Sequence, residues 1–427
     1  MKRYAMELLI QWKNSKHRKP LILQGARQVG KTWLMTEFGK QFYENVAYVD
    51  FRNNRRMQKL FEGDFDIPRL IEGLQVETHE KITPEKTLII FDEVQEAGLA
   101  LTSLKYFYEN AHEYHIVAGG SLLGVAVHEG ISFPVGKVDF CNLYPLNFCE
   151  FLEGIGEIGL AELLHKNDWE MAAAFKTKFA DYLRKYYFVG GMPECVSIYS
   201  EDRDYDAVRK TQNDILAEYE KDFSKHVPNR LIAKIRSVWA NVPRLLARER
   251  NCFSPGVIKK GSRANEYADA IQWLVDAGLI YRVPRITKPA IPLKSYADDA
   301  FKIYMLDVGL LGAASELDAL TLLEGDLVFT EFKGSLTENY VCQELTARGI
   351  TPFYWSSERT AEVDFVFKLG VDILPLEAKA GENLQGKSLR IYYDKFNPKF
   401  AMRTSMKDYR EESWMKNIPL YGIGVWE

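Results

Sequence analysis

The chain is poor in cysteine and histidine, and neither residue type is spaced as in a metal site. Its five cysteines are scattered, odd in number and never spaced as Cys-x-x-Cys, which argues against a disulfide framework and a zinc ribbon. The seven histidines include His112 and His115 but no His-Glu-x-x-His pattern, so a surface pair is expected there. We interpret the cysteines as free thiols in a reducing compartment.

The sequence also lacks a long hydrophobic run and a strong net charge. The N-terminal apolar run is too short for a signal peptide, and the apolar stretch at 116–127 is too short and too glycine-rich to span a bilayer. We therefore expect a cytoplasmic protein without a membrane partner. The formal net charge is only −4, so any surface for nucleic acid must be local. Internal repeats and low-complexity tracts are absent.

With 427 residues, the chain is long enough for two to four domains. Apolar runs predict strands at 19–24, 46–51, 87–92, 115–118 and 137–143. Helical patterns at 4–12, 31–42 and 101–110 accompany them. Strands that alternate with helices predict an α/β fold with a doubly wound parallel sheet. From residue 146 the pattern turns helical, at 148–152, 160–188 and 203–225.

A phosphate-binding loop is predicted where the first strand meets the first long helix. The residues Gly25, Ala26, Arg27, Gln28, Val29, Gly30, Lys31 and Thr32 fit Gly-x-x-x-x-Gly-Lys-Thr without a mismatch. Glycines allow backbone N–H groups to surround phosphate oxygens, and the helix N-terminus favours negative charge. Lys31 is then expected to reach the β- and γ-phosphates of ATP, and Thr32 to bind Mg²⁺.

An acidic pair completes this predicted site. Asp92 ends the apolar strand at 87–92 and is expected to hold Mg²⁺, and Glu93 follows it as a candidate general base for water attack. The alternative for Glu93 is a simple helix cap. Ser121 follows the next strand and is a candidate γ-phosphate sensor, although a plain Gly-Gly-Ser turn explains it equally well. The second acid favours hydrolysis over a metabolic kinase.

The chain resembles a known family in the motifs GARQVGKT, FDEVQ, AGGSLLG, PVGKVDF-x3-YPLNFCEFL and VGGMPE. These are similar, along the full length, to bacterial and archaeal AAA-type ATPases with a C-terminal domain of unknown function and a nuclease-like core. The resemblance implies an AAA+ core, ATP as the nucleotide and a helical lid whose Gly191-Met192-Pro193 contacts that nucleotide. Lys137 stands where relatives often have arginine, so it stays open whether a neighbouring copy in a homo-oligomer supplies an arginine finger.

A second site is predicted near the C-terminus. Glu338 lies in a helical run, Asp364 near the start of a strand, and Glu377 and Lys379 on one face of a following strand. In this order they resemble the PD-(D/E)xK nuclease fold, with Val363 in place of the usual proline. Asp364 and Glu377 are then expected to share a Mg²⁺, and Lys379 to activate a water for phosphodiester cleavage. Two alternatives are a chance pattern and a nuclease fold that has lost its chemistry.

The block 227–296 has a local positive charge, with 13 lysines and arginines against 4 aspartates and glutamates. Two helical runs, at 230–248 and 264–277, and a proline-broken hairpin at 279–296 resemble a winged helix. DNA binding and a purely structural role are equally compatible with this block, since acidic residues lie in its second helix. The candidate DNA contacts are Lys259, Lys260, Arg263, Arg282, Arg285 and Lys288.

The sequence thus predicts a multidomain α/β protein. The expected parts are a P-loop AAA+ ATPase core at 1–145, a helical lid at 146–226, a winged-helix-like module at 227–310 and a PD-(D/E)xK nuclease-like domain at 311–427. The first functional hypothesis is an ATP-hydrolysing switch coupled to a metal-dependent nuclease that acts on DNA. The alternative is an ATP-dependent signalling or assembly scaffold with an inactive nuclease-like domain.

Overall fold

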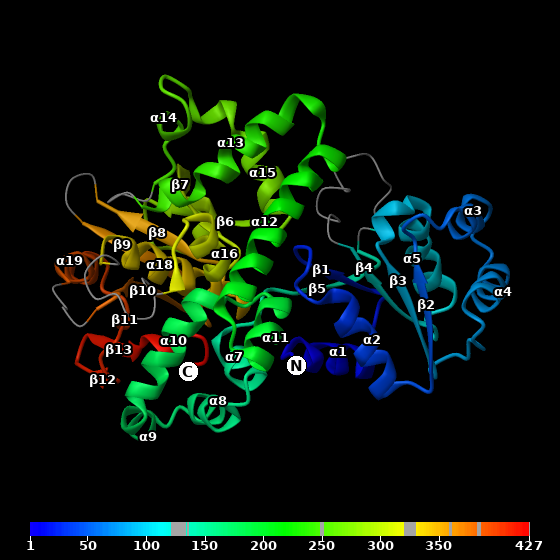
Figure 1. The fold of residues 1–427 in the computed structure, drawn as a ribbon, viewed down its shortest axis with the longest axis horizontal. Coiled ribbons are helices and arrows are strands. Elements are labelled where there is room, and N and C mark those ends of the chain that lie inside the picture. The colour runs from blue at the N-terminus through cyan, green and yellow to red at the C-terminus, as the bar shows by residue number, and fades with distance from the viewer. Residues whose placement is uncertain are drawn as a thin grey trace. The chain divides into compact units, whose positions relative to one another are not determined.

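The structure is a computed structural model that describes residues 1–120, 134, 136–247, 252–319, 330–357, 361–381 and 386–426 (Figure 1). The chain forms two compact units, essentially residues 2–144 and residues 145–427. Each unit is built around its own sheet.

The N-terminal unit is a five-stranded parallel sheet with the strand order β2-β3-β4-β1-β5. Its strands are β1 (Leu21–Gln24), β2 (Asn45–Asp50), β3 (Thr87–Asp92), β4 (His115–Gly119) and β5 (Asp139–Asn142). Its helices are α1 (Ala5–Asn14), α2 (Lys31–Phe42), α3 (Arg55–Glu62), α4 (Ile67–Thr78), η1 (Val94–Glu96) and α5 (Gly98–Asn110). The predicted α/β fold with a parallel sheet is confirmed.

Burial explains why these segments form strands. Every residue of β3 is buried, as expected for a strand between two neighbours with both faces covered. On one face, α3, α4 and α5 enclose a core with the sheet, in which Phe51, Phe61 and Phe91 pack edge to face. Helix α2 contacts β2, β3 and β4 through its own buried face.

Helices α3 and α4 were not predicted, although each has an N-terminal cap. The side chains of Asn54 and Asp66 accept hydrogen bonds from the backbone N–H groups of Met57 and Arg69. An Asn or Asp before such a segment is a start signal for a helix.

The C-terminal unit begins with a run of helices. They are α7 (Phe148–Gly154), α8 (Ile158–His165), α9 (Trp169–Ala174), α10 (Lys176–Val189), α11 (Pro193–Asp202), α12 (Tyr205–His226) and α13 (Asn229–Leu246). Shorter elements follow, namely α14 (Pro255–Ile258), η3 (Ala264–Glu266) and α15 (Ala268–Asp276). The helical region predicted at 160–188 consists of α8, α9 and α10, with Asn167 in a left-handed conformation between the first two.

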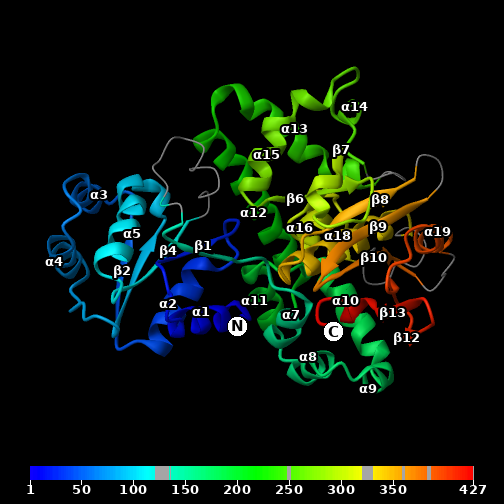
Figure 2. The same cartoon turned by 180° about the vertical axis from the view of Figure 1, so that it is seen from behind.

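An eight-stranded mixed sheet forms the rest of this unit, with the order β12-β13-β11-β10-β9-β8-β6-β7. Its strands are β6 (Ile280–Ile286), β7 (Ala297–Met305), β8 (Phe353–Ser356), β9 (Glu362–Leu369), β10 (Asp372–Ala378), β11 (Ala401–Ser405), β12 (Arg410–Glu411) and β13 (Met415–Pro419). The helical elements beside them are η4 (Leu293–Tyr296), α16 (Val308–Ala314), α18 (Thr330–Ala347), α19 (Lys387–Phe396) and η5 (Leu420–Gly422). Figure 2 shows β8, β9 and β10 side by side.

The hairpin of the predicted winged-helix-like module is placed differently from its prediction. It is formed by β6 and β7, so the range 279–296 contains only its first strand and the connection. Strand β6 also pairs in parallel with β8, and the hairpin is therefore part of the large sheet. The expected module boundary at residue 310 consequently falls inside one sheet-bearing unit.

The VGGMPE motif, residues 189–194, lies between α10 and α11 and packs closely against the start of α16. The carboxylate of Asp307 accepts hydrogen bonds from the N–H groups of Gly191, at 2.6 Å, and Leu310, at 2.9 Å. A Cβ on Gly191 would lie 2.1 Å from the carbonyl oxygen of Leu146, and one on Gly190 would lie 2.2 Å from Asp307 Oδ1. Glycine is required here because the backbones approach too closely for a side chain.

This joint predicts opposite effects for two glycines of α16. A Cβ on Gly309 would meet backbone atoms of Val189 and Gly190 at 2.6–2.7 Å, whereas the nearest atom to a Cβ on Gly312 is 3.8 Å away. We expect Gly309→Ala to destabilise the protein by about 1–3 kcal/mol through overpacking. Gly312→Ala is the matched control and should be neutral or stabilising by up to roughly 1 kcal/mol, because alanine favours a helix. Urea unfolding of both variants measures the difference, and equal midpoints would contradict the assigned packing.

Candidate functional site

The segment between β1 and α2 forms a tight loop at the carboxyl edge of the parallel sheet. Gly25 and Gly30 have positive φ angles of 151° and 92°. A Cβ on Gly25 would lie 2.2 Å from the carbonyl oxygen of Leu143, so no other residue fits without rearrangement. The loop leads directly into the N-terminus of α2, whose free N–H groups suit a phosphate.

Lys31 lies under this loop and is only 8% exposed. Its ammonium donates hydrogen bonds to the carbonyl oxygens of Gly25, at 2.8 Å, and Ala26, at 2.6 Å. Burial lowers the pKa of Lys31 to about 8, against the opposing effect of the nearby carboxylates of Glu93 and Asp92. The cation is therefore held in place by the loop itself.

Asp92 lies at the end of β3 and is oriented by three donors. Thr32 Oγ1 and Tyr48 Oη donate to its Oδ2, at 2.7 and 2.8 Å, and the N–H of Glu93 donates to its Oδ1 at 3.0 Å. These donors are a threonine, a tyrosine and a backbone amide, so they fix the carboxylate without bringing a positive charge. The sequence did not single out Tyr48, although it lies on β2, which pairs with β3.

Glu93 does not act as a side-chain cap for η1, so the capping alternative lacks its hydrogen bond. Instead, Gln95 Nε2 donates to Glu93 Oε2 at 2.6 Å, and Arg52 Nη1 lies 3.9 Å from Glu93 Oε1. Arg52 is itself held by the carboxylate of Asp50 at 2.8 Å. These three neighbours were missed from the sequence. The available signal was the end of β2, since Asp50 pairs in register with Asp92.

The oxygen atoms around Thr32 and Asp92 suit Mg²⁺. Hard cations of this size prefer hydroxyl, carboxylate and phosphate oxygens, and the two side chains present such atoms 2.7 Å apart beside the loop. The residues present therefore fit this ion.

Two further predicted nucleotide contacts, Ser121 and Pro193, are not among the described residues of the N-terminal unit. Ser121 lies outside the described residues. Pro193 is the first residue of α11 in the C-terminal unit, where Gly191 is bound to Asp307. Lys137, at the place of the expected arginine, forms an ion pair with Glu109 at 2.9 Å.

Two of the predicted nuclease-like residues, Glu338 and Asp364, lie near a buried cation that sequence reasoning missed. Lys302 on β7 is 1% exposed, and its Nζ lies 2.6 Å from Glu362 Oε1, 3.4 Å from Glu338 Oε2 and 4.0 Å from Asp364 Oδ1. Tyr304 Oη donates to Glu338 Oε2 at 2.8 Å. Burial and the Glu338 carboxylate raise the pKa of Asp364 to about 8, and Lys302 opposes this shift.

Glu377 lies on the neighbouring strand β10, and Lys379 directly follows the last residue of that strand. Lys379 Nζ contacts Glu377 Oε1 at 3.0 Å, and Arg403 Nε lies 3.7 Å from Glu377 Oε2. Asp364 is tied to the same strand, because its Oδ2 accepts from the N–H of Ala378 at 2.9 Å. Within the described residues, no three or more His, Cys, Asp and Glu side chains are grouped so that they could hold a metal ion. The carboxylates of Asp364 and Glu377, which were expected to share a Mg²⁺, each lie near a positively charged side chain of the chain itself.

The candidate DNA contacts differ in the interactions that their side chains make within the chain. Arg285 is bound to Asp298 through two nitrogens, at 2.8 and 2.9 Å, and the Arg282 guanidinium stacks 4.3 Å from the ring centre of Phe301. Five of the six side chains are exposed, namely Lys259, Lys260, Arg263, Arg282 and Lys288.

Residues 17–152 match the model of a family described as an AAA domain. The N-terminal unit is a P-loop ATPase domain of the AAA type. Two further models match residues 180–321 and 314–423, and their families are described as domains of unknown function (DUF8612 and DUF4143). The chain has no match among curated proteins. None of the helices in the described part of the chain combines the length and the apolarity that crossing a membrane requires.

Three solved structures resemble parts of the chain at low identity. The Walker-type ATPase PABY2304 of Pyrococcus abyssi is 14% identical, with 74% of this chain and 95% of that chain covered and a TM-score of 0.43. The Aeropyrum pernix ORC1 protein in complex with DNA is 14% identical, with 73% and 90% covered and a TM-score of 0.28. Drosophila ORC bound to DNA is 12% identical, with 74% and 95% covered and a TM-score of 0.28. Similarity at this level carries no functional argument.

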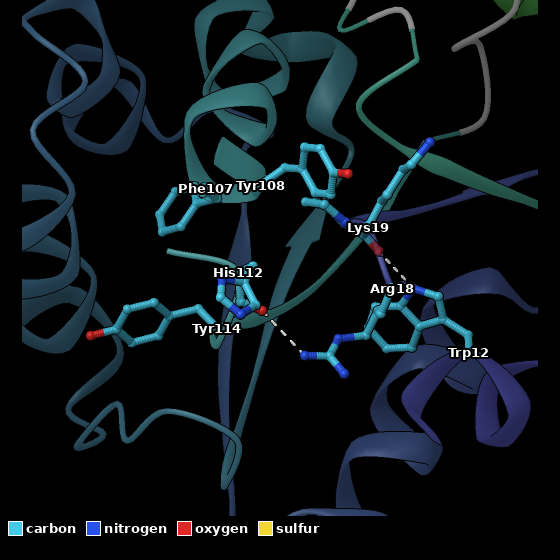
Figure 3. Close-up of a pocket in the computed structure, with 8 residues that line it drawn as sticks. Trp12, Arg18, Lys19, Phe107, Tyr108, His112 and Tyr114 are labelled. Carbon is cyan, nitrogen blue, oxygen red and sulfur yellow. Dashed lines mark hydrogen bonds between the residues drawn. The ribbon is translucent and has the colours of Figure 1, made fainter. Parts of the chain in front are cut away.

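The AAA domain also has a small aromatic pocket, shown in Figure 3. Trp12, Arg18, Tyr108 and Tyr114 are among its lining residues, and an Arg18 nitrogen donates to the carbonyl oxygen of His112 at 3.2 Å. This pocket lies where β1 and β4 begin, whereas the P-loop lies where β1 ends. It is therefore a separate feature from the nucleotide site.

The hydroxyl of Tyr48 is expected to matter for metal-dependent turnover in the AAA domain. Tyr48→Phe removes one of the donors that orient Asp92, at a cost of about 1–2 kcal/mol, or roughly a five- to thirtyfold higher Mg²⁺ requirement. Tyr43→Phe is the matched control, since its hydroxyl bonds to His115 at 2.7 Å instead. The measurement is ATP turnover against Mg²⁺ concentration, and equal curves for both variants would contradict this role.

Proposed function

We propose that this protein is a Mg²⁺-dependent, ATP-hydrolysing switch. The observation that carries the proposal is the convergence of Lys31, Thr32, Asp92 and Glu93 at the carboxyl edge of the N-terminal sheet. A buried cation, an oriented carboxylate and a second carboxylate are the groups that phosphoryl transfer to water requires.

Each group has a distinct task in this proposal. The N–H groups of the P-loop and of the α2 N-terminus bind the phosphates, and Lys31 positions the β- and γ-phosphates. A Mg²⁺ ion held by Thr32 and Asp92 would offset the phosphate charge. The carboxylate of Glu93 orients the attacking water and accepts its proton, while Gln95 and Arg52 restrain the direction of that carboxylate.

For the C-terminal unit, the geometry favours the hypothesis of a module without nuclease activity. The ammonium of Lys302 already lies among Glu338, Glu362 and Asp364, so these carboxylates face a fixed cation. In this proposal ATP binding and hydrolysis change how the unit engages its partners. DNA is one candidate partner, through the exposed cations of the block 227–296, and a second copy of the chain is another.

Substitution of Glu93 tests the ATPase proposal. Glu93→Gln should lower ATP turnover by roughly 10²–10⁴-fold and leave nucleotide binding intact, because it removes only the general base. Lys31→Ala should instead weaken nucleotide binding. Glu44→Gln is the control, since Glu44 forms an exposed ion pair with Lys86. No turnover by the wild type would overturn the ATPase proposal, and wild-type turnover by Glu93→Gln would remove Glu93 from it.

A cleavage assay tests the proposed absence of nuclease activity. Plasmid and single-stranded DNA are incubated with wild type and Asp364→Ala, with Mg²⁺ or Mn²⁺, and with or without ATP. We expect neither protein to cleave, because Lys302 and Arg403 already lie beside these carboxylates. Cleavage by the wild type that is lost in Asp364→Ala would establish the nuclease hypothesis instead.

A further inference from the structure

Lys302 has the smallest exposed fraction among the buried lysines and arginines of the described residues, at 1%. A charge is expensive to bury unless partners compensate it. Here the partners come from separate elements, because Glu338 belongs to α18 whereas Glu362 and Asp364 belong to β9. The fold therefore brings carboxylates to this ammonium from two sides.

Strand geometry explains why they meet. Glu362 and Asp364 alternate with Val363, which packs into the core beside α19, so the two acids point to the other face of β9. Lys302 and Tyr304 lie two residues apart on β7 and both contact Glu338. Carboxylate oxygens around one cation are also what a divalent ion prefers. As they lie around Lys302, however, these three side chains are not grouped so that they could hold a metal ion.

The Lys302 ammonium already interacts with these carboxylates, so few of their oxygen atoms remain for a metal ion. The ammonium has three N–H donors, and Nζ lies within 4.0 Å of all three carboxylates. Two carboxylate oxygens have further donors: Glu338 Oε2 accepts from Tyr304, and Asp364 Oδ2 accepts from Ala378. The Lys302 ammonium also lies 5.3 Å from the ring centre of Tyr354, which favours a cation.

We propose that the Lys302 ammonium takes the place of a divalent cation between Glu338, Glu362 and Asp364. The cluster is then complete without metal, and it becomes a divalent-cation site only when Lys302 is removed. This inference extends the proposed absence of nuclease activity, and it concerns metal binding rather than cleavage.

Lys302→Met tests the inference in the full chain without nucleotide. Removing the ammonium leaves the partly buried carboxyl groups without their cation, so the Tm should fall by roughly 5–15 °C. Mn²⁺ or Mg²⁺ at millimolar concentration should restore much of that loss in the variant and leave the Tm of the wild type unchanged. A Mn²⁺ titration followed by electron paramagnetic resonance should show one additional bound ion in the variant.

A second substitution in the Lys302→Met variant identifies the residues that bind the additional ion. Glu338→Gln or Asp364→Asn, added to Lys302→Met, should abolish the additional Mn²⁺ binding, whereas a weak ion at Asp92 would be unaffected. Lys399→Met is the matched control, because Lys399 is an exposed lysine that pairs with Asp372 at 3.3 Å. It should change neither the Tm nor its response to Mn²⁺.

Each outcome decides the inference. A Mn²⁺ site in the wild type that depends on Glu338 or Asp364 overturns it, and so does a folded Lys302→Met variant that gains no ion. If Lys302→Met fails to fold, Lys302→Gln is refolded with and without Mn²⁺, and only a Mn²⁺-dependent yield supports the inference. A DNA cleavage result leaves these arms unchanged, so the two proposals fail separately.

Discussion

The hydrogen bond from Thr32 to Asp92 joins segments that are 60 residues apart, and the nucleotide site depends on it. It is possible because β1 and β3 run parallel with only β4 between them, so both strands end at the same edge. The same register places Asp50 and Tyr48 of β2 next to Asp92 and its strand. A loss of register by one residue would turn Asp92 to the other face of the sheet.

A second constraint links the glycine-rich motif at 189–194 to the acidic cluster. Asp307, which binds Gly191, follows β7 after one intervening residue, and β7 carries Lys302 and Tyr304. The buried carboxylate of Asp307 has its pKa raised to about 6 by desolvation, and backbone N–H donors, first that of Gly191, offset the shift. Gly191, two residues before α11, is thus fixed to the residue that precedes α16 within one unit. Because the backbones at Gly190, Gly191 and Gly309 are in close contact, we expect Pro193 to move only together with these segments.

The sequence was sufficient where function and local structure share one signal. The loop from Gly25 to Thr32 has a fixed spacing, and β3 is a continuous apolar run, so both were predictable. Tyr48, Arg52 and Lys302 were not, because their roles arise from strand pairing and not from spacing along the chain. Lys302 in particular lies on β7, which begins only after the range 279–296 that the sequence pattern assigned to a hairpin. The connection between β6 and β7 defines its register, and that register became visible only in the folded sheet.

The carboxylate of the nucleotide site and the carboxylate cluster of the C-terminal unit have their negative charge balanced in opposite ways. Asp92 is oriented by hydroxyl and amide donors, which leave its charge available to an incoming cation. Glu338, Glu362 and Asp364 instead surround an ammonium that belongs to the chain and cannot dissociate. An exchangeable cation makes a site responsive to its ligand, whereas a covalently attached cation makes it permanent. The first arrangement suits a cycle of nucleotide binding and release, and the second suits a fixed structural centre in the sheet of the C-terminal unit.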